Sequence, residues 1–200
     1  MHALAPVLVT APSETAVSRA ELKRHLVIEH DEDDLLLDAA LAGALAMVDV
    51  PDGRLGRALV TQRWQFRWDA FPDAETEWRL RWMPVVTDPA PVLTYLDANG
   101  ASQPLATTVW RIDTDDEGPV ITLKDGQDWP ETAEAPDAVR LEISLGYGAA
   151  ASVPAGIRAA ILMAAADLYR FRDSGAATAA ASDVVDRWLM PYRRPWGWAC

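Results

Sequence analysis

The stretch VPAGIRAAILMAAADLYRFR, Val153 to Arg172, decides the fold of this chain. Alanine, leucine and methionine favour helix, and Pro154 suits a first helical turn, so the stretch predicts one long helix. Ala159 to Ala166 carries no charge, which is typical of a helix that is buried on more than one side. The run is too short to span a bilayer. Either the rest of the domain or a neighbouring subunit therefore covers the second side, and the small alanines would permit a close approach.

The composition limits the classes of function. The 200 residues are enough for one domain, or for one domain with an insertion, and half of them are hydrophobic. The net charge of −12 argues against tight, sequence-independent binding of nucleic acid, which needs clustered Lys and Arg. The single cysteine, Cys200, excludes an internal disulfide and fits a reducing compartment. Met1 to Thr10 does not have the pattern of a signal peptide and no apolar run is long enough for a membrane span, so we expect no membrane partner.

Two helices are predicted near the start of the chain. Residues 1–14, which contain two prolines, are expected to form an irregular arm. Ser18–Glu21 has capping-box spacing, which predicts a short helix that ends at about Leu26. Asp31 is expected to cap a second helix, which runs from Asp34 to about Val48.

The period of the apolar residues changes from near four to two between Leu59 and Leu145, which predicts antiparallel strands. Two of these strands, 64–68 and 78–82, alternate aromatic or leucine residues with Arg and Gln. Further strands and a hairpin are predicted at Val92–Leu96, Val109–Ile112, Val120–Leu123 and Val139–Leu145.

These elements predict an α+β fold, in which a helical core of about four helices carries an inserted antiparallel β unit between helix 2 and the long Ala-rich helix. The expected divisions are residues 1–58 for the N-terminal arm and two helices, and 59–148 for the β unit. Residues 149–191 hold the long helix and a short C-terminal helix from Asp183 to Met190, and belong to the same core as 15–58. Residues 192–200 form a C-terminal tail.

No constellation of residues predicts catalysis. His25 and His30 lie beside Asp31–Asp34, but their spacing fits no zinc pattern. Asp113–Gly118 is only loosely like a calcium loop, because the closing bidentate glutamate is missing. Cys200 has no histidine near it in sequence, and no serine lies in a Gly-x-Ser-x-Gly elbow. We therefore expect no enzyme activity, no metal site and no cofactor.

Six tryptophans of the predicted β unit allow two interpretations. They form either a stacking platform for sugars, which would make the chain a Trp-lined carbohydrate-binding module, or the core of the sheet. Their alternation with Arg and Gln favours the core, because a buried face needs that pattern. The opposite face would be solvated or would contact an acidic neighbour. The tryptophans are Trp64, Trp68, Trp78, Trp82, Trp110 and Trp129, and the arginines of the opposite face are Arg63, Arg67, Arg79 and Arg81.

The end of the chain, Tyr192 to Cys200, is basic and aromatic although the protein as a whole is acidic. Trp and Arg are the residues that most often anchor interfaces, whereas an unused terminus frays. A partner contact is the favoured interpretation, because exposed tryptophan without a use lowers solubility.

Several segments between about Thr15 and Arg193 carry a resemblance to a known family. In their order and spacing they resemble the head–tail connector proteins, also called adaptor or head-completion proteins, of long-tailed phages and of phage-like gene transfer agents. The Pro51–Gly56 segment and the Trp-rich end depart from the family pattern. The matching segments are LKRHLVIEHDEDD (22–34), GRALVTQRW (56–64), TYLDANG (94–100), GQDWP (126–130), GYG (146–148) followed by Val153-Pro154, and PYR (191–193).

The resemblance implies a structural protein without enzyme activity, which forms a homo-oligomeric ring, usually of twelve subunits, beneath the portal protein. The ring would join the capsid to the neck and tail and bind a stopper or neck protein. Double-stranded DNA would pass through its channel without specific binding. The protein would be assembled in the bacterial cytoplasm and lie at the head–tail neck of a virion or gene transfer agent particle.

The resemblance also assigns roles to residues of this chain. The family's C-terminal segment contacts the portal, so that role would belong to Tyr192, Arg193, Arg194, Trp196 and Trp198. A ring needs a patch on each subunit that is buried against a different patch of the next one, which suits an Ala-rich helix apolar on two sides. The expected interface residues of the helix are Ala155, Ala159, Leu162, Met163, Ala166 and Arg170.

Overall fold

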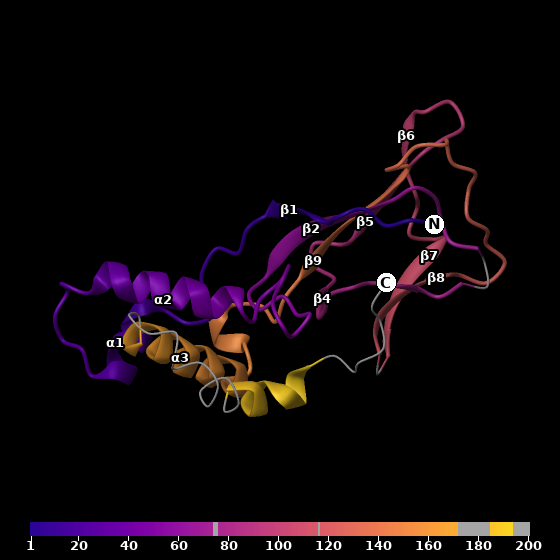
Figure 1. The fold of residues 1–200 in the computed structure, drawn as a ribbon. Helices are drawn as coiled ribbons and strands as arrows, with labels where there is room; N and C mark the ends of the chain where they lie inside the picture. Colours follow the sequence, from indigo (N-terminus) through magenta and orange to yellow (C-terminus); the bar gives the residue numbers. More distant parts are fainter. Residues whose placement is uncertain (74–75, 116, 172–184, 194–200) are drawn as a thin grey trace. The chain divides into compact units, whose positions relative to one another are not determined.

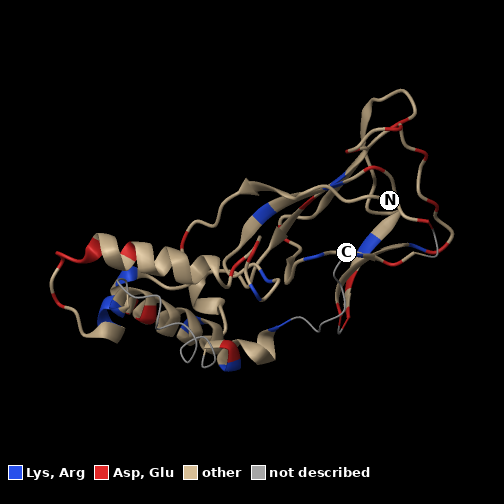
Figure 2. Cartoon of the chain, in the orientation of Figure 1, with Lys and Arg blue, Asp and Glu red and all other residues tan. Residues whose placement is uncertain are grey.

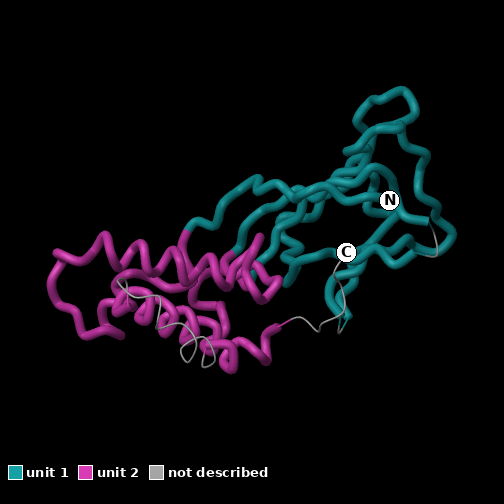
Figure 3. The backbone as a smooth tube through the Cα atoms, viewed as in Figure 1, with its two compact units in different colours: residues 1–13, 61–146 teal, residues 14–60, 147–200 magenta. Residues whose placement is uncertain are grey.

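The computed structural model describes residues 1–73, 76–115, 117–171 and 185–193, and shows two compact units (Figure 3). The β unit comprises Met1–Ser13 and Thr61–Gly146, and the helical unit comprises Glu14–Val60 and Tyr147–Cys200. Helices in one unit and antiparallel sheets in the other confirm the predicted α+β class. The first thirteen residues belong with the strands, because one of their segments pairs with a strand of the β unit.

The helical unit consists of α1 (Arg19–Leu26), α2 (Asp34–Ala46) and α3 (Ala155–Arg170), with residues 185–189 also helical (Figure 1). Two short 3₁₀ turns, η1 (Ala150–Ser152) and η3 (Met190–Tyr192), complete it. Its core contains the stripe of α3 that includes Ile157 and Ile161, both 0% exposed, together with apolar side chains from α1, α2 and residues 185–189. α3 is therefore the central helix of this unit.

Local signals set the ends of α1. Ser18 accepts a hydrogen bond from the Glu21 backbone N–H, and the Glu21 side chain accepts one from the Ser18 N–H, so the predicted capping box is present. The prediction that Asp31 caps α2 is wrong. Asp33 occupies the N-cap without a side-chain cap bond, whereas Asp31 binds Lys23 of α1. Asp31 thus forms an ion pair with α1 and does not cap α2.

α2 and α3 pack closely at Gly43. A Cβ atom placed on Gly43 would lie 3.2 Å from Cδ1 of Leu168, which is tighter than an ordinary van der Waals contact. Glycine at this position therefore lets the two helices approach. Two buried alanines of α3, Ala160 and Ala165, are also small, and both are 0% exposed.

The β unit holds two antiparallel sheets, one with the strand order β1-β2-β9-β5-β6, in which β4 also pairs with β9, and one with the order β3-β8-β7. In the first sheet β2 pairs with β9 so that Trp64 faces Ile143 and Phe66 faces Leu141. The strands are β1 (Val7–Thr10), β2 (Gln62–Trp68), β3 (Trp78–Arg79), β4 (Val85–Val86), β5 (Val92–Leu96), β6 (Ser102–Pro104), β7 (Trp110–Asp115), β8 (Gly118–Leu123) and β9 (Val139–Leu145).

Two strand predictions need correction. Residues 7–10, expected in an irregular arm, form the edge strand β1 beside β2. The predicted strand over 78–82 is regular only at 78–79, although the alternation of buried and exposed side chains continues, with Leu80 at 1% and Trp82 at 2% exposed. Periodicity reports which side chains are buried, whereas a strand also needs a hydrogen-bonding partner along its length.

Val27, which follows α1, has φ 59° and ψ 45°, a left-handed conformation that a β-branched residue rarely adopts. Its side chain is 82% exposed, so little burial compensates for the strain. We expect Val27→Gly to raise the free energy of unfolding by about 1 kcal/mol, because glycine adopts this conformation without the Cβ penalty. Urea denaturation of both proteins measures the change. Val27→Ala, which keeps a Cβ, should give less, and equal effects of glycine and alanine would contradict the explanation.

Candidate functional site

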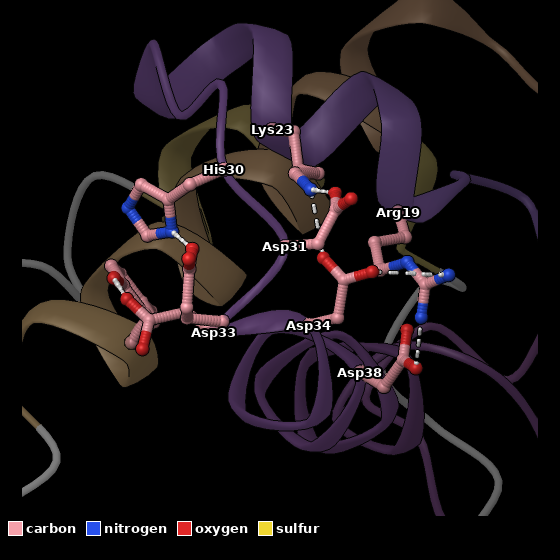
Figure 4. Close-up of polar contacts among 9 residues, drawn as sticks. Arg19, Lys23, His30, Asp31, Asp33, Asp34 and Asp38 are labelled. Carbon is pink, nitrogen blue, oxygen red and sulfur yellow. Dashed lines mark hydrogen bonds and ion pairs between the residues drawn. The ribbon is translucent and has the colours of Figure 1, made fainter.

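The turn between α1 and α2 carries a network of ion pairs (Figure 4). Lys23 Nζ lies 2.5 Å from Asp31 and 2.8 Å from Asp34, and this pairing raises the pKa of Lys23 and lowers that of Asp31. Arg19 contacts Asp38 at 2.6 Å and Asp34 at 3.4 Å. These carboxylates already have cationic partners. Within the described part of the chain, no group of three or more His, Cys, Asp or Glu residues is placed to hold a metal ion.

The tip of this turn is joined to α3. The Tyr169 hydroxyl of α3 donates to Asp33 at 2.5 Å, and Arg158 of α3 pairs with Glu21 of α1. The hydrogen bonds that Ser18 gives to Glu21, together with Arg158, lower the pKa of that glutamate. The polar contacts thus hold α1 and α3 together rather than forming a reactive site.

The six residues predicted to form the subunit interface of α3 do not share one open face. Ala166 is buried at 3% exposure, and Leu162 and Met163 are partly buried against the core of their own unit. Ala159 is half-buried, and Ala155 and Arg170, at opposite ends of the helix, are exposed. Most of the second apolar side of α3 is therefore covered within one chain.

The open apolar face lies instead on α2, for which no such face was predicted. Leu35, which is 83% exposed, is followed at helical spacing by three exposed alanines, Ala39, Ala42 and Ala46. The opposite side of α2, which includes Leu37 and Leu41, is buried in the core. The sequence of α2 could have indicated this face, because Asp34 and Asp38 are its only charged residues and the rest of the helix is apolar. Figure 2 shows the acidic residues gathered toward the N-terminal end of this helix.

The start of the predicted C-terminal tail is anchored on the helical unit. Arg57 Nε donates to the Tyr192 carbonyl at 2.6 Å. Asp186 accepts from Arg193 at 2.8 Å and from Arg54 at 2.9 Å. Tyr192 and Arg193, expected to contact the portal, are thus half-buried against their own chain, whereas Arg194, Trp196 and Trp198 lie outside the described residues.

A shallow hollow of about 370 Å³ lies beside this anchored segment. Gly156 forms part of it, and a Cβ atom there would lie 2.8 Å from the Tyr192 hydroxyl, so glycine makes room for the tyrosine ring. The outer wall includes Arg187, Trp188 and Pro191. Trp188 is 48% and Met190 65% exposed, so this end of the unit offers a second apolar surface next to a cation.

The four arginines predicted to share a contact face of the β unit lie on different elements. Arg63 and Arg67 project from β2 in the larger sheet, where Arg63 lies 3.3 Å from Glu142 and Arg67 donates to the Ala5 carbonyl at 3.1 Å. Arg79 belongs to β3 in the smaller sheet, and Arg81 is exposed in the segment after it. Three of the four arginines, Arg63, Arg67 and Arg79, therefore bind residues of their own unit.

Arg79 forms the best-defined ion pair of the β unit. Its guanidinium donates two hydrogen bonds of 2.8 Å to the carboxylate of Asp115 and one of 2.8 Å to Glu77. This contact raises the pKa of Arg79, and the hydrogen bond from Arg79 holds the pKa of Asp115 at about 2.

The lowered pKa of Asp115 predicts a pH dependence of stability. A carboxyl whose pKa is lower in the folded than in the unfolded state stabilises the fold above its unfolded pKa, near 3.8, and loses this contribution as the pH falls toward about 2. We expect the difference in urea midpoint between the wild type and Asp115→Asn to be constant above pH 5 and to shrink between pH 4 and pH 2. A difference that stayed constant down to pH 2 would contradict the pairing.

The tryptophans of the β unit form its core. Trp64, Trp68, Trp78 and Trp82 are at most 5% exposed, and so is Trp110. Trp64 and Trp82 meet edge to face with ring centroids 4.6 Å apart. Trp129 is half-buried and is stacked on Phe71, which occupies one face of its ring. Buried rings are not available to stack on a sugar. The burial of these tryptophans therefore argues against the carbohydrate-binding interpretation.

Among known proteins, chains with a similar fold are found in solved structures. No protein-family model and no curated protein matches it. It is similar to a chain of the virion of a native gene transfer agent particle, with a TM-score of 0.76 and 25% identity over 98% of this chain and 99% of that one. It is also similar to a chain of the neck of the native particle, computed with C12 symmetry, with a TM-score of 0.77, 25% identity and the same coverage. A third match, in the neck of the empty particle computed with C6 symmetry, has a TM-score of 0.75, 26% identity and the same coverage.

Proposed function

We propose that this chain is a structural protein of the neck of a phage-like gene transfer agent particle. The observation that carries the proposal is the match of its fold to virion and neck chains over 98% of its length, at TM-scores of 0.75 to 0.77. The match covers both the helical unit and the β unit. A likeness of a single common module would not extend over two units joined in the same order.

Within the neck, the finer role is that of the adaptor, a ring beneath the portal that joins the capsid to the next neck protein. Twelve subunits are the proposed number, because a similar chain belongs to a neck computed with C12 symmetry. The net charge of −12 suits a channel through which DNA slides, because acidic walls repel phosphate rather than bind it.

The proposed partners are the portal protein, a stopper or neck protein, and double-stranded DNA that is not specifically bound. The portal contact is assigned to the C-terminal tail from Tyr192 onward. The anchoring of Tyr192 and Arg193 by Arg57 and Asp186 would then give the rest of the tail a fixed starting point on the helical unit. The protein is not an enzyme in this proposal, and it is assembled in the bacterial cytoplasm.

Deletion of the gene in the cell that encodes it tests the proposal. We expect DNA-filled heads without attached tails, and restoration of tailed particles by the wild-type gene. Deletion of residues 194–200, which keeps the anchored Tyr192 and Arg193, should abolish attachment of the ring to the head without unfolding the protein. Tailed particles that form normally without the protein, or purified necks that do not contain it, would overturn the proposal.

A further inference from the structure

The helical unit carries two exposed apolar surfaces that complement each other. The first, here called the α2 face, consists of Leu35, Ala39, Ala42 and Ala46. The second, here called the C-terminal face, consists of Arg187, Trp188 and Met190. In Figure 1, α3 lies between α2 and the segment that contains the C-terminal face. The two surfaces thus belong to different sides of one unit.

Shape and charge both fit the two faces to each other. Three of the four α2 side chains are methyl groups, which leave room for large neighbours, and the C-terminal face offers a Trp ring and a Met side chain. The charges along α2 are the acidic Asp34 and Asp38, which pair with Arg19 of α1, and Asp38 is still 48% exposed. The C-terminal face carries Arg187, which is exposed and makes no ion pair among the described residues.

We infer that the α2 face of one subunit docks on the C-terminal face of the next copy of this chain. A contact between two different patches is head-to-tail, and repetition of such a contact closes a ring when the rotation from one copy to the next divides a full turn. The similar chains in necks computed with C12 and C6 symmetry supply the second observation, because each copy there has rotationally related neighbours. The inference rests on the proposed function and moves the subunit contact from the predicted face of α3 to α2.

Cross-linking within assembled particles tests the contact directly. The chain has a single cysteine, Cys200, so Cys200→Ser provides a background for Ala39→Cys combined with Trp188→Cys. With a short bis-maleimide, necks that contain the double-cysteine chain are expected to give a ladder of dimers, trimers and higher multiples of this chain. Each single-cysteine chain should give no cross-linked dimer, because a head-to-tail contact does not bring like residues together.

The outcomes separate the inference from the proposed function. Necks that contain the chain but give no ladder, or that give only a product with a different neck protein, would overturn the α2 contact and leave the neck role intact. A cross-linked dimer from either single-cysteine chain would indicate a two-fold contact and would also overturn it. Absence of the chain from the necks would overturn both.

An added cation on the α2 face provides an independent measurement. Ala42→Arg places a cation opposite Arg187 and is expected to lower incorporation of the chain into necks by roughly thirtyfold or more, as for a residue at the centre of an interface. Ala20→Arg, at an exposed alanine of α1, is the matched control and should leave incorporation unchanged. Adding Arg187→Glu to Ala42→Arg should recover part of the loss, because the new ion pair removes the repulsion although the larger side chain still fills the space beside Ala42. Normal incorporation of Ala42→Arg would overturn the inference.

Discussion

Replacement of Trp64 by alanine is expected to lower the free energy of unfolding of the β unit by about 3–5 kcal/mol, because it removes a large buried ring and leaves a cavity. Trp64 is 4% exposed, packs edge to face on Trp82, and donates from Nε1 to Gln62 at 3.0 Å. Urea denaturation followed by circular dichroism measures the change.

Trp188→Ala is the matched control for this variant. Its ring is 48% exposed, so the same chemical change should cost less than about 1 kcal/mol. The same preparations test the sugar interpretation, because the wild type should pass through polysaccharide columns without retention. A stable Trp64→Ala protein, or wild-type retention that this substitution abolishes, would instead support a tryptophan platform for carbohydrate.

Ile161→Ala is expected to destabilise the helical unit by about 2–5 kcal/mol, because Ile161 is 0% exposed at the centre of α3. The control on the same helix is Leu168→Ala. Leu168 is 41% exposed and reaches Gly43 of α2 with its Cδ1 atom, so its truncation should cost only about 1 kcal/mol.

The comparison of these two variants tests how α3 divides its surface. Thermal unfolding of the isolated protein gives both values in one type of experiment. Similar losses for Ile161→Ala and Leu168→Ala would mean that the helix is not divided into a sealed core and an outer side, and that the core assignment is wrong. Normal assembly of a folded Leu168→Ala chain into necks is expected as well, because Leu168 belongs to neither docking face.

Several elements could be predicted from local sequence, because their causes are local. The capping box at Ser18 and Glu21 set the start of α1, since both of its hydrogen bonds close within one turn. Strand β9 has the bounds predicted from alternation alone, and β5 also matches. The aromatic core of the β unit followed from the same period-two pattern, because a buried face must repeat every second residue.

The candidate site was predicted less well, since its parts depend on contacts between distant residues. Arg79 pairs with a residue 36 positions away, which the alternation along its own strand does not reveal. Arg54 and Arg193 meet at Asp186, and the first of these contacts joins residues 132 positions apart. Arg79 was expected on a basic contact face and Arg193 in a portal-docking tail, but both contact residues of their own units.

The sequence by itself determined that the helix over 153–172 has more apolar surface than one buried stripe needs, and that the period-two segments before it form a β unit. Only the tertiary structure decided that this helix is mostly sealed and that α2 carries the open face. α3 lies among α1, α2 and the C-terminal segment, so its excess apolar surface is mostly covered, whereas α2 lies at the edge of the unit and keeps Leu35 exposed. Composition sets how much apolar surface a helix has, but the neighbours that cover it come from packing between segments far apart in the chain.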